Sequence, residues 1–424
     1  MHDNTLLALP KQHAKGIRNG LPSICSAHPL VIEAALRSGL ENDTEVLIEA
    51  TCNQVNQDGG YTGMTPADFR RFAEGIADKL GFDKSRLILG GDHLGPNPWK
   101  HLPANEALAK AATMMKAFVE AGFTKIHLDA SMACADDPVA LPPSIIAQRA
   151  ADLAAIAEKS AGPVKPVYII GTEVPIPGGA MEALDHLQVT RAEDAKETIE
   201  LHRLAFSSRG LEEAFNRVIG LVVQPGVEYG HEDVIAFKPE EAKDLSAVLK
   251  DFPQIVFEAH STDYQTLTGL SELVEDGFAI LKVGPWLTFA MREALYGLDR
   301  IACELMDIPS VDTLEATMER VMLNLPKEWE KYYPGNATEQ RILRHYSYSD
   351  RIRYYWPQPE AQKAFNRLMS NLEGKKIPET LISQFMAPVY QDVVSGKVEA
   401  TPKELIIATI RKVVDTYARA ARQI

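Results

Sequence analysis

Acidic and imidazole side chains recur in this chain at the ends of short apolar runs. The run "LILGGDHLGP" passes through two glycines to Asp92 and His93, "FEAHSTD" carries Glu258 and His260, and "VYIIGTEV" reaches Glu173. A buried charge is costly unless it is paired, so stability alone gives no reason for such strand ends. Imidazoles and carboxylates that converge from separate segments are a plausible ligand set for a divalent metal, with one position open for substrate.

The elements that must position these residues are short β-branched runs that alternate with helical patterns. Eight such runs begin at Leu21, Val46, Arg86, Lys125, Val167, Val218, Ile255 and Ala279. Helix starts between them are well marked: in "MTPADF", Thr65 fits a cap, Pro66 the first helical position and Asp68 the positive helix end. Eight alternations predict a closed α/β barrel, (β/α)8, and an open doubly wound sheet is the alternative. Closure is favoured because no run is left over that resembles an edge strand.

The last quarter of the chain has a different pattern. After about residue 305 the segments are helical and no further strand is convincing. We therefore expect a barrel over residues 1–305 and a helical extension over residues 306–424. No low-complexity linker separates the two parts, so the extension should pack directly on the barrel.

The alternation of side chains along each strand indicates which of them face the barrel lumen. Even-numbered and odd-numbered residues of a strand point to opposite faces, and the face that packs on the surrounding helices must be apolar. Wherever the residues of one parity, even or odd, are polar, those residues therefore face inwards. The residues placed in the lumen by this rule are Glu49, Thr51, Asn53, His127, Asp129, Ser131, Glu173, Glu258, His260 and Lys282. Asp92 and His93 have opposite parity, so one of them must turn at the strand end, which the neighbouring glycines permit.

Barrel active sites lie at the C-terminal strand ends, which is where most of these polar residues stand. The alternative is a buried polar network that holds the lumen together. That alternative is strongest for Glu49, His127 and Glu258, which lie lower in their strands.

Three further stretches are candidates for substrate contacts. Lys282 and Gly284 precede a helix start in "LKVGPWLTFAMREAL", and loops after the seventh and eighth strands of barrels often bind phosphate. The stretch "RHYSYSDRIRYYW" interleaves Arg351 and Arg353 with aromatic residues. One of these arginines would hold a phosphate in bidentate fashion, or else the stretch is a packed aromatic joint. The glycine-rich residues 53–63 resemble an active-site loop.

Composition limits the classes of partner. The net charge of -14 argues against nucleic acid and anionic membranes. No apolar run approaches the roughly 20 residues that span a bilayer, and the first residues lack the apolar core of a secretion signal. Four scattered cysteines without a C-x-x-C pair suit a reducing compartment, so we expect a cytoplasmic protein. Cys52 is a candidate ligand or a small buried residue, and the second interpretation is favoured.

Eight motifs in order resemble one known family over almost the whole chain. They are "IEATCNQVNQDGGYTGMTPADF", "LGGDHLGPN", "KIHLDASM", "GTEVPIPGGA", "VVQPGVEYGH", "FEAHSTDYQT", "LKVGPWLTFAMREAL" and "HYSYSDRIRYYWP". Together they are similar to the Z-type subunit family of D-tagatose-1,6-bisphosphate aldolase. The resemblance implies a barrel related to class II aldolases and a place in galactitol, N-acetylgalactosamine or tagatose catabolism. Members of that family are described as a non-catalytic aldolase partner, as a tagatose-6-phosphate kinase, or as a 4-epimerase of D-tagatose 6-phosphate.

The residues discriminate among these descriptions. A kinase is disfavoured because the chain has no G-x-x-x-x-G-K-[ST] loop. A purely structural partner does not need acids and imidazoles at so many strand ends. Epimerisation at C4 of a 2-ketose cannot use simple deprotonation, because that proton is not adjacent to the carbonyl. Oxidation by a nicotinamide would call for a G-x-G-x-x-G after a strand, which is absent. Retro-aldol cleavage between C3 and C4, followed by re-addition, remains.

The resemblance assigns roles to individual residues. An Asp-His pair of the class II aldolases maps onto Asp92 and His93, but no histidine stands at the top of the eighth strand. The catalytic candidates are Asp92, Asp129 and Glu258. The metal candidates are His93, Glu173 and His260, with zinc as the expected divalent ion. The substrate and phosphate candidates are Asn53, Lys282, Gly284, Arg351 and Arg353. The expected partners are a phosphorylated ketose, a class II aldolase catalytic subunit, or further copies of the chain as a homo-oligomer.

Overall fold

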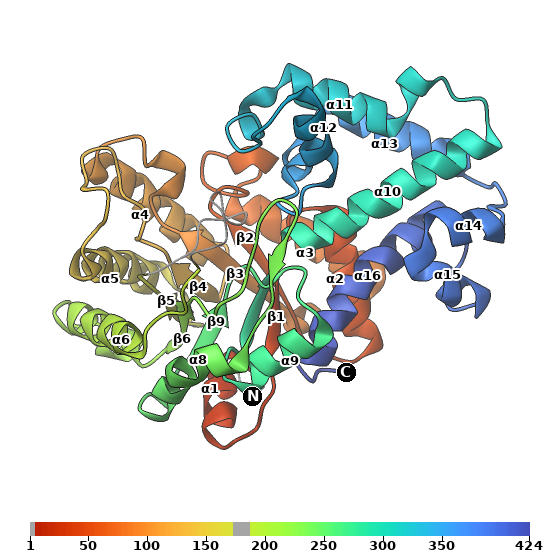
Figure 1. The fold of residues 1–424 in the computed structure, drawn as a ribbon. Helices are drawn as coiled ribbons and strands as arrows, with labels where there is room; N and C mark the ends of the chain where they lie inside the picture. The colour runs from red at the N-terminus through yellow and green to blue at the C-terminus, as the bar shows by residue number, and fades with distance from the viewer. Residues whose placement is uncertain (1–4, 173–186) are drawn as a thin grey trace.

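The computed structural model describes residues 5–172 and 187–424, and eight parallel strands close into a barrel at its centre (Figure 1). The order around the barrel is β1-β10-β9-β6-β5-β4-β3-β2. The barrel strands are β1 (Leu21–Cys25), β2 (Val46–Thr51), β3 (Leu87–Leu94), β4 (Lys125–Leu128), β5 (Val167–Ile170), β6 (Val218–Val223), β9 (Val256–Ala259) and β10 (Ile280–Val283). The closed barrel predicted from the eight runs is thus confirmed, and the open sheet is excluded.

Helices surround the barrel between consecutive strands. They are α2 (Pro29–Glu41), α3 (Pro66–Leu80), α4 (Ala104–Glu120), α5 (Pro143–Ser160), α6 (Ala192–Ser207), α7 (Glu212–Phe215), α8 (Pro239–Ala247) and α9 (Leu267–Glu275). A two-stranded hairpin, β7 (Glu228–Tyr229) with β8 (Val234–Ile235), lies between β6 and α8. The predicted start of α3 is confirmed: Thr65 and Asp68 form a capping box and Pro66 is the first helical residue.

The N-terminal end of the barrel is closed by an apolar plug. Helix α1 (Thr5–Ala14) lies below the strands in Figure 1 and contacts β6 and β9. Leu6 and Leu9 of this helix are buried with a layer of strand residues: Leu21, Leu47, Val167, Ile169, Ile219, Val222, Val256, Ala279 and Ile280. The lumen is therefore apolar at this end, and its polar residues lie above the plug.

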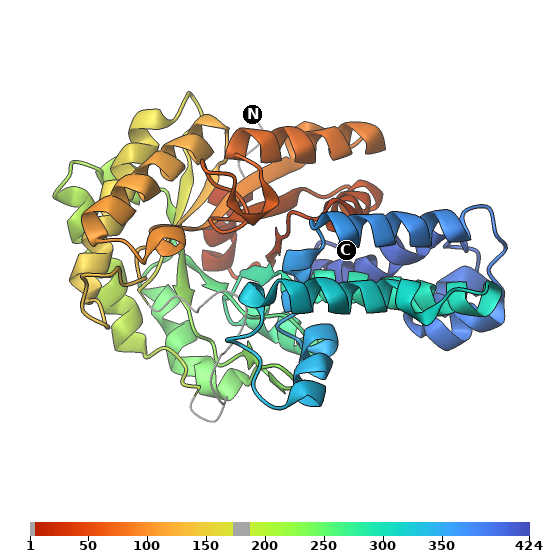
Figure 2. The same cartoon turned by 90° about the horizontal axis from the view of Figure 1, so that it is seen from above.

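The segment after β10 leaves the barrel and forms most of the extension, which projects to one side (Figures 1 and 2). Its helices are α10 (Pro285–Leu305), α11 (Leu314–Asn324), α12 (Ala337–Tyr346), α13 (Pro359–Leu372), α14 (Glu379–Phe385), α15 (Ala387–Val394) and α16 (Pro402–Ala420). A 3₁₀ turn at Arg351–Tyr355 lies between α12 and α13.

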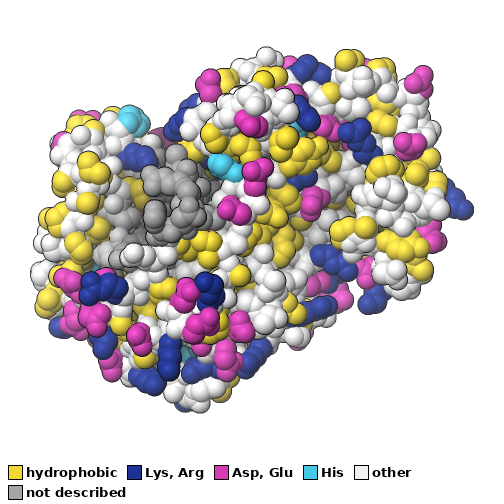
Figure 3. All heavy atoms as spheres, in the orientation of Figure 1, with side chains coloured by type: hydrophobic (Ala, Val, Ile, Leu, Met, Phe, Trp, Pro, Cys, Tyr) yellow, Lys and Arg dark blue, Asp and Glu magenta, His cyan; other side chains and the backbone are white. Residues whose placement is uncertain are grey.

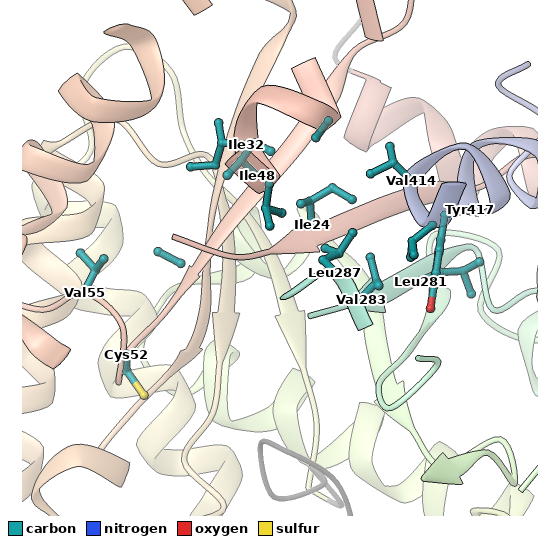
Figure 4. Packing of buried hydrophobic residues seen from close by; sticks show 14 of the residues in the cluster. Ile24, Ile32, Ile48, Cys52, Val55, Leu281, Val283, Leu287, Val414 and Tyr417 are labelled. Atoms are coloured by element: carbon teal, nitrogen blue, oxygen red, sulfur yellow. The ribbon is translucent and has the colours of Figure 1, made fainter. Parts of the chain in front are cut away.

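The last helix, α16, returns to the barrel. It packs against α2 and α9, contacts β1, and so takes the place in the ring between the seventh helix and the first. Figure 4 shows Val414 and Tyr417 of this helix beside Ile24, Leu281 and Val283 of β1 and β10. Residues 306–424 were predicted to be a helical extension packed on the barrel, and α16, within this range, packs on β1 and completes the ring of helices.

No helix among the described residues combines the length and the apolar character that crossing a bilayer requires. On the face in Figure 3, acidic and basic side chains are intermingled over the barrel helices at the lower left.

Candidate active site

A cavity lies at the C-terminal ends of the barrel strands, and seven of the predicted site residues line it. These are Asn53, Asp92, His93, His260, Lys282, Gly284 and Arg353. Other lining residues come from β1, the loop after β2, the β7 strand, the loop after β9 and the extension; they include Cys25, Tyr61, Tyr229, Asp263 and Tyr354. The extension therefore provides one wall of the cavity.

Asp92 and His93 both reach the cavity because β3 is irregular at its end. The pairing of β3 with β4 shifts register between Gly91 and Leu94, and His93 has a positive φ of 50°. A bulge of this kind turns two consecutive side chains to the same side. Gly95 then passes so close to β4 that a Cβ would lie 1.6 Å from the carbonyl oxygen of Asp129, so only glycine fits. The predicted turn at the strand end is confirmed.

Three buried imidazoles form a nearly equilateral triangle below the cavity opening. The ring centroids of His93 and His127 lie 5.0 Å apart, those of His93 and His260 5.0 Å, and those of His127 and His260 5.3 Å. One ligand atom from each ring and one from Asp92 all lie within 4.8 Å of one another.

Each imidazole has a carboxylate partner on one ring nitrogen. The pairs are His93 Nδ1 with Asp129 Oδ2 at 2.9 Å, His127 Nδ1 with Asp92 Oδ1 at 2.9 Å, and His260 Nε2 with Glu258 Oε1 at 2.9 Å. For His93 and His260, a ring proton directed at the carboxylate leaves the other nitrogen with a lone pair. His127 Nδ1 lies between two groups, because it also receives the backbone N–H of His93 at 3.2 Å. His127 Nε2 is buried and has no hydrogen-bond partner among the residues that the structure describes. This carboxylate–imidazole arrangement is the one that orients histidine ligands on a metal, so the residues fit a divalent cation.

His127 was predicted to face the lumen, but it was not assigned as a ligand. Its alternation with Asp129 indicated that it faces the lumen, but that pattern does not encode its depth, one residue before β4 ends at Leu128. Glu173, the third predicted ligand, lies outside the described residues. Asp129 and Glu258 contact imidazoles and do not line the cavity, which favours an orienting function for both.

Below the imidazoles, two lysines and three carboxylates form a buried network. Lys125 Nζ lies 2.6 Å from Glu49 Oε1 and 2.7 Å from Glu258 Oε2, and all three side chains have no exposed surface. Lys282 contacts Glu49 and lies 2.8 Å from Asp92 Oδ1. Lys125 was not identified from the sequence, although it stands two residues before His127 on the same side of β4.

The network fixes the charge of Asp92. Burial alone would raise the pKa of this carboxyl, but His93, Lys282 and the hydrogen bond from His127 hold it well below its usual range. Burial lowers the pKa of His260 to about 4, so this ring is neutral at physiological pH, as a metal ligand must be. Burial would also lower the pKa of His93, but Asp92 and Asp129 raise it instead.

The two arginines of the aromatic stretch have different environments. Arg353 lines the cavity, and it donates to the backbone oxygens of Ser349 and Asp350 and, at 3.0 Å, to Tyr354 Oη. Arg351 does not line the cavity. It donates to the backbone oxygen of Glu328, and its guanidinium lies 3.4 Å from the ring centroid of Tyr332. Arg351 therefore belongs to an aromatic joint within the extension, which is the alternative interpretation of this stretch.

The start of α10 differs from the expected phosphate site. Asp263 Oδ1 accepts hydrogen bonds from the backbone nitrogens of Gly284, at 3.0 Å, and Trp286, at 2.8 Å. Burial raises the pKa of Asp263 to about 6, although both hydrogen bonds and Arg353 oppose the rise. Asp263 was not identified from the sequence, because it follows the strand end in a segment with no parity to indicate its direction.

Comparison with known proteins places the chain in a family. The family described as "D-tagatose-1,6-bisphosphate aldolase subunit GatZ/KbaZ-like" matches residues 6–422. The chain belongs to this GatZ/KbaZ-like family. It is 54% identical over 404 residues to a protein of Agrobacterium fabrum named D-tagatose 6-phosphate 4-epimerase, covering 95% of this chain and 94% of the relative.

A solved structure from Sinorhizobium meliloti 1021, named a probable tagatose 6 phosphate kinase, shares the fold of this GatZ/KbaZ-like chain. The two are 57% identical, with a TM-score of 0.89 over 95% of this chain and 100% of the other. The family resemblance inferred from the eight motifs is thus confirmed over nearly the whole chain.

The Lys125 network leads to a prediction about stability. Replacing Lys125 by methionine leaves Glu49 and Glu258 buried beside each other with fewer cations, so we expect a loss of about 3–5 kcal/mol of unfolding free energy. In that variant the two carboxyls should have raised pKa values, so the deficit should shrink as the pH is lowered and they take up protons. Urea denaturation at several pH values measures both effects. Lys412→Met, in the exposed part of α16, is the matched control, and equal stability of the two variants would contradict the prediction.

Proposed function

We propose that this protein is a metal-dependent 4-epimerase that converts D-tagatose 6-phosphate to D-fructose 6-phosphate by retro-aldol and aldol steps. The observation that carries the proposal is the position of Asp92: its carboxylate lies against the three-imidazole cluster and lines the cavity. The name of the Agrobacterium fabrum relative supports the same substrate and reaction.

The cluster is suited to one divalent cation held by His93, His127 and His260, and zinc is the first candidate because all three donors are imidazole nitrogens. When bound, such a cation would supply Lewis-acid stabilisation of negative charge on the ketone oxygen of the substrate. Asp129 and Glu258 act as positioning residues, since each fixes the orientation and proton of one ring.

The chemistry of C4 gives Asp92 its role. Breaking the C3–C4 bond turns the C4 hydroxyl into an aldehyde, so its proton must leave as the bond breaks. Asp92 is ionised and lies at the cavity, and it accepts that proton. Lys282, 2.8 Å from Asp92, keeps the carboxylate charged before the reaction. After rotation of the aldehyde, the same proton returns to the oxygen as the bond re-forms with the opposite configuration at C4.

Arg353, on the extension side of the cavity, and Asn53 would bind the substrate. Arg353 is a fully charged guanidinium held in place by backbone oxygens, and it would pair with the phosphate. Asn53 would bind a hydroxyl of the sugar. Phosphoryl transfer from a nucleotide is not favoured, because the sequence has no nucleotide-phosphate loop.

The second candidate function is a non-catalytic aldolase subunit, and the description of the family favours it. Incubating the purified chain alone with D-tagatose 6-phosphate and Zn²⁺ distinguishes the two. We expect fructose 6-phosphate to form, and to stop forming when a chelator is added. No product from the chain alone, together with stimulation of a class II aldolase, would favour the subunit instead.

The metal site makes a prediction that does not depend on turnover. His127→Ala should weaken Zn²⁺ binding by more than the roughly 10–100-fold typical of losing an outer-shell partner. Asp129→Asn, which removes such a partner of His93, should fall within that range. Calorimetric titration of metal-stripped protein measures both, with His101→Ala on the surface as the control. Unchanged affinity in His127→Ala would rule out the three-imidazole site.

The role of Asp92 makes a prediction about rate and about isotopes. Asp92→Asn should lose about 10²–10⁴-fold in kcat, the usual contribution of a positioned acid/base, while still binding Zn²⁺ through the imidazoles. Substrate deuterated at C4 should retain its label in the product, because that hydrogen stays on the aldehyde carbon. Loss of the label to solvent would mean direct deprotonation at C4. The protein must also lack nicotinamide absorbance, since a bound nicotinamide could return the same hydride.

A further inference from the structure

The start of α10 is the position where a barrel of this kind offers backbone donors to an anion. It follows the eighth strand directly, it has 21 residues, and its first backbone N–H groups have no partner within the helix. In this chain those donors are already used. Pro285 has no N–H, and Asp263 accepts the N–H groups of Gly284 and Trp286. A carboxylate of the protein therefore occupies the place that a phosphate would take.

The position of Asp263 is fixed by its surroundings. The residue is only 3% exposed, yet it lines the cavity. The neighbouring Thr262 donates to the backbone oxygen of Lys282, and Tyr417 of α16 donates to the backbone oxygen of Thr262 at 2.7 Å. Ser261 and Tyr264 on either side have positive φ values of 52° and 65°. Such constraints on the backbone hold Asp263 in place, so an incoming anion cannot simply displace it.

The cavity has few other cations for a phosphate. Among the described residues that line it, the lysines and arginines are Lys282 and Arg353. Lys282 is engaged with Glu49 and Asp92 inside the lumen. Arg353 donates to backbone oxygens and a tyrosine hydroxyl, and no carboxylate pairs with it within the described residues. One phosphate thus has a cationic partner, and a second would meet the carboxylate of Asp263.

We propose that Asp263 is a specificity-determining residue: by filling the anion site at the start of α10, it restricts the cavity to ketoses that carry one phosphate. This proposal rests on the proposed function, and it adds how the cavity recognises the end of the ketose that carries no phosphate. Both helix hydrogen bonds go to Oδ1, so Oδ2 is not used by the helix. A sugar hydroxyl can donate to that oxygen, whereas a second phosphate brings a negative charge against it. Repulsion of the wrong ligand contributes as much to selectivity as attraction of the right one.

The test counts anion sites and needs no turnover. Crystals of wild-type protein soaked in inorganic phosphate should show one ion, at Arg353. Asp263→Ala should show a second ion on the N–H groups of Gly284 and Trp286. Asp263→Asn keeps these donors occupied by the amide oxygen and should not gain the second ion. Glu228→Gln is the matched control, because Glu228 is a buried carboxyl near Asp263 that does not line the cavity.

A competition assay gives the matching affinity. D-Tagatose 1,6-bisphosphate should compete with a bound monophosphate about tenfold or more tightly in Asp263→Ala than in wild type, and Glu228→Gln should not change this ratio. A phosphate ion on the α10 donors of the wild-type protein would overturn the proposal, and so would an Asp263→Ala protein that gains neither the second ion nor bisphosphate affinity. If Asp263→Ala does not fold, the number of phosphate ions bound to Asp263→Ser and to the wild-type protein decides whether the proposal holds. Failure of the wild-type chain to epimerise its substrate would refute the proposed function and leave these ion counts unaffected.

Discussion

The compensation of buried charge in the barrel lumen is the constraint on which the site depends. Four carboxylates lie there among the described residues, Glu49, Asp92, Asp129 and Glu258, against two ammonium groups, those of Lys125 and Lys282. If the imidazoles are neutral, two negative charges remain uncompensated, and uncompensated charge in a protein interior is costly. A divalent cation at the imidazole cluster would supply two positive charges. The carboxylates that orient the imidazole rings thus also contribute the negative charge that a bound metal ion would neutralise.

The sequence predicts the barrel well because barrel formation depends on local patterns. Strand runs, helix caps and glycine stops each lie within a few residues, and all eight strands occur where the β-branched runs stand. The place of α16 could not be predicted in this way. Its apolar face indicates that the helix packs on another part of the protein but not on which part. The space between α9 and α2 that it fills exists only in the folded barrel.

The candidate site was predictable to the extent that strand parity holds. Parity placed Asn53, His260 and Lys282 at the cavity, and the glycines around Asp92 and His93 permitted the turn at the strand end that brings both inwards. Parity gives direction but not depth, so it could not show that His127 completes a triangle or that Glu258 only orients a ring. It also ends where the strand ends. Asp263 and the distinction between Arg351 and Arg353 depend on loop conformation, which no periodic pattern encodes.

The return of α16 to the ring also has a consequence for how the protein is made. Residues 402–420 pack against α2 and contact β1, both of which are synthesised long before them. Contacts between segments that are far apart in sequence form late, because the intervening residues must be in place first. On the ribosome, β1 and β10 can pair as soon as both have emerged, but the apolar surface around Ile24 stays uncovered until α16 leaves the exit tunnel. Between these two events, the nascent chain has a closed sheet whose outer face exposes a hydrophobic seam where α16 will pack.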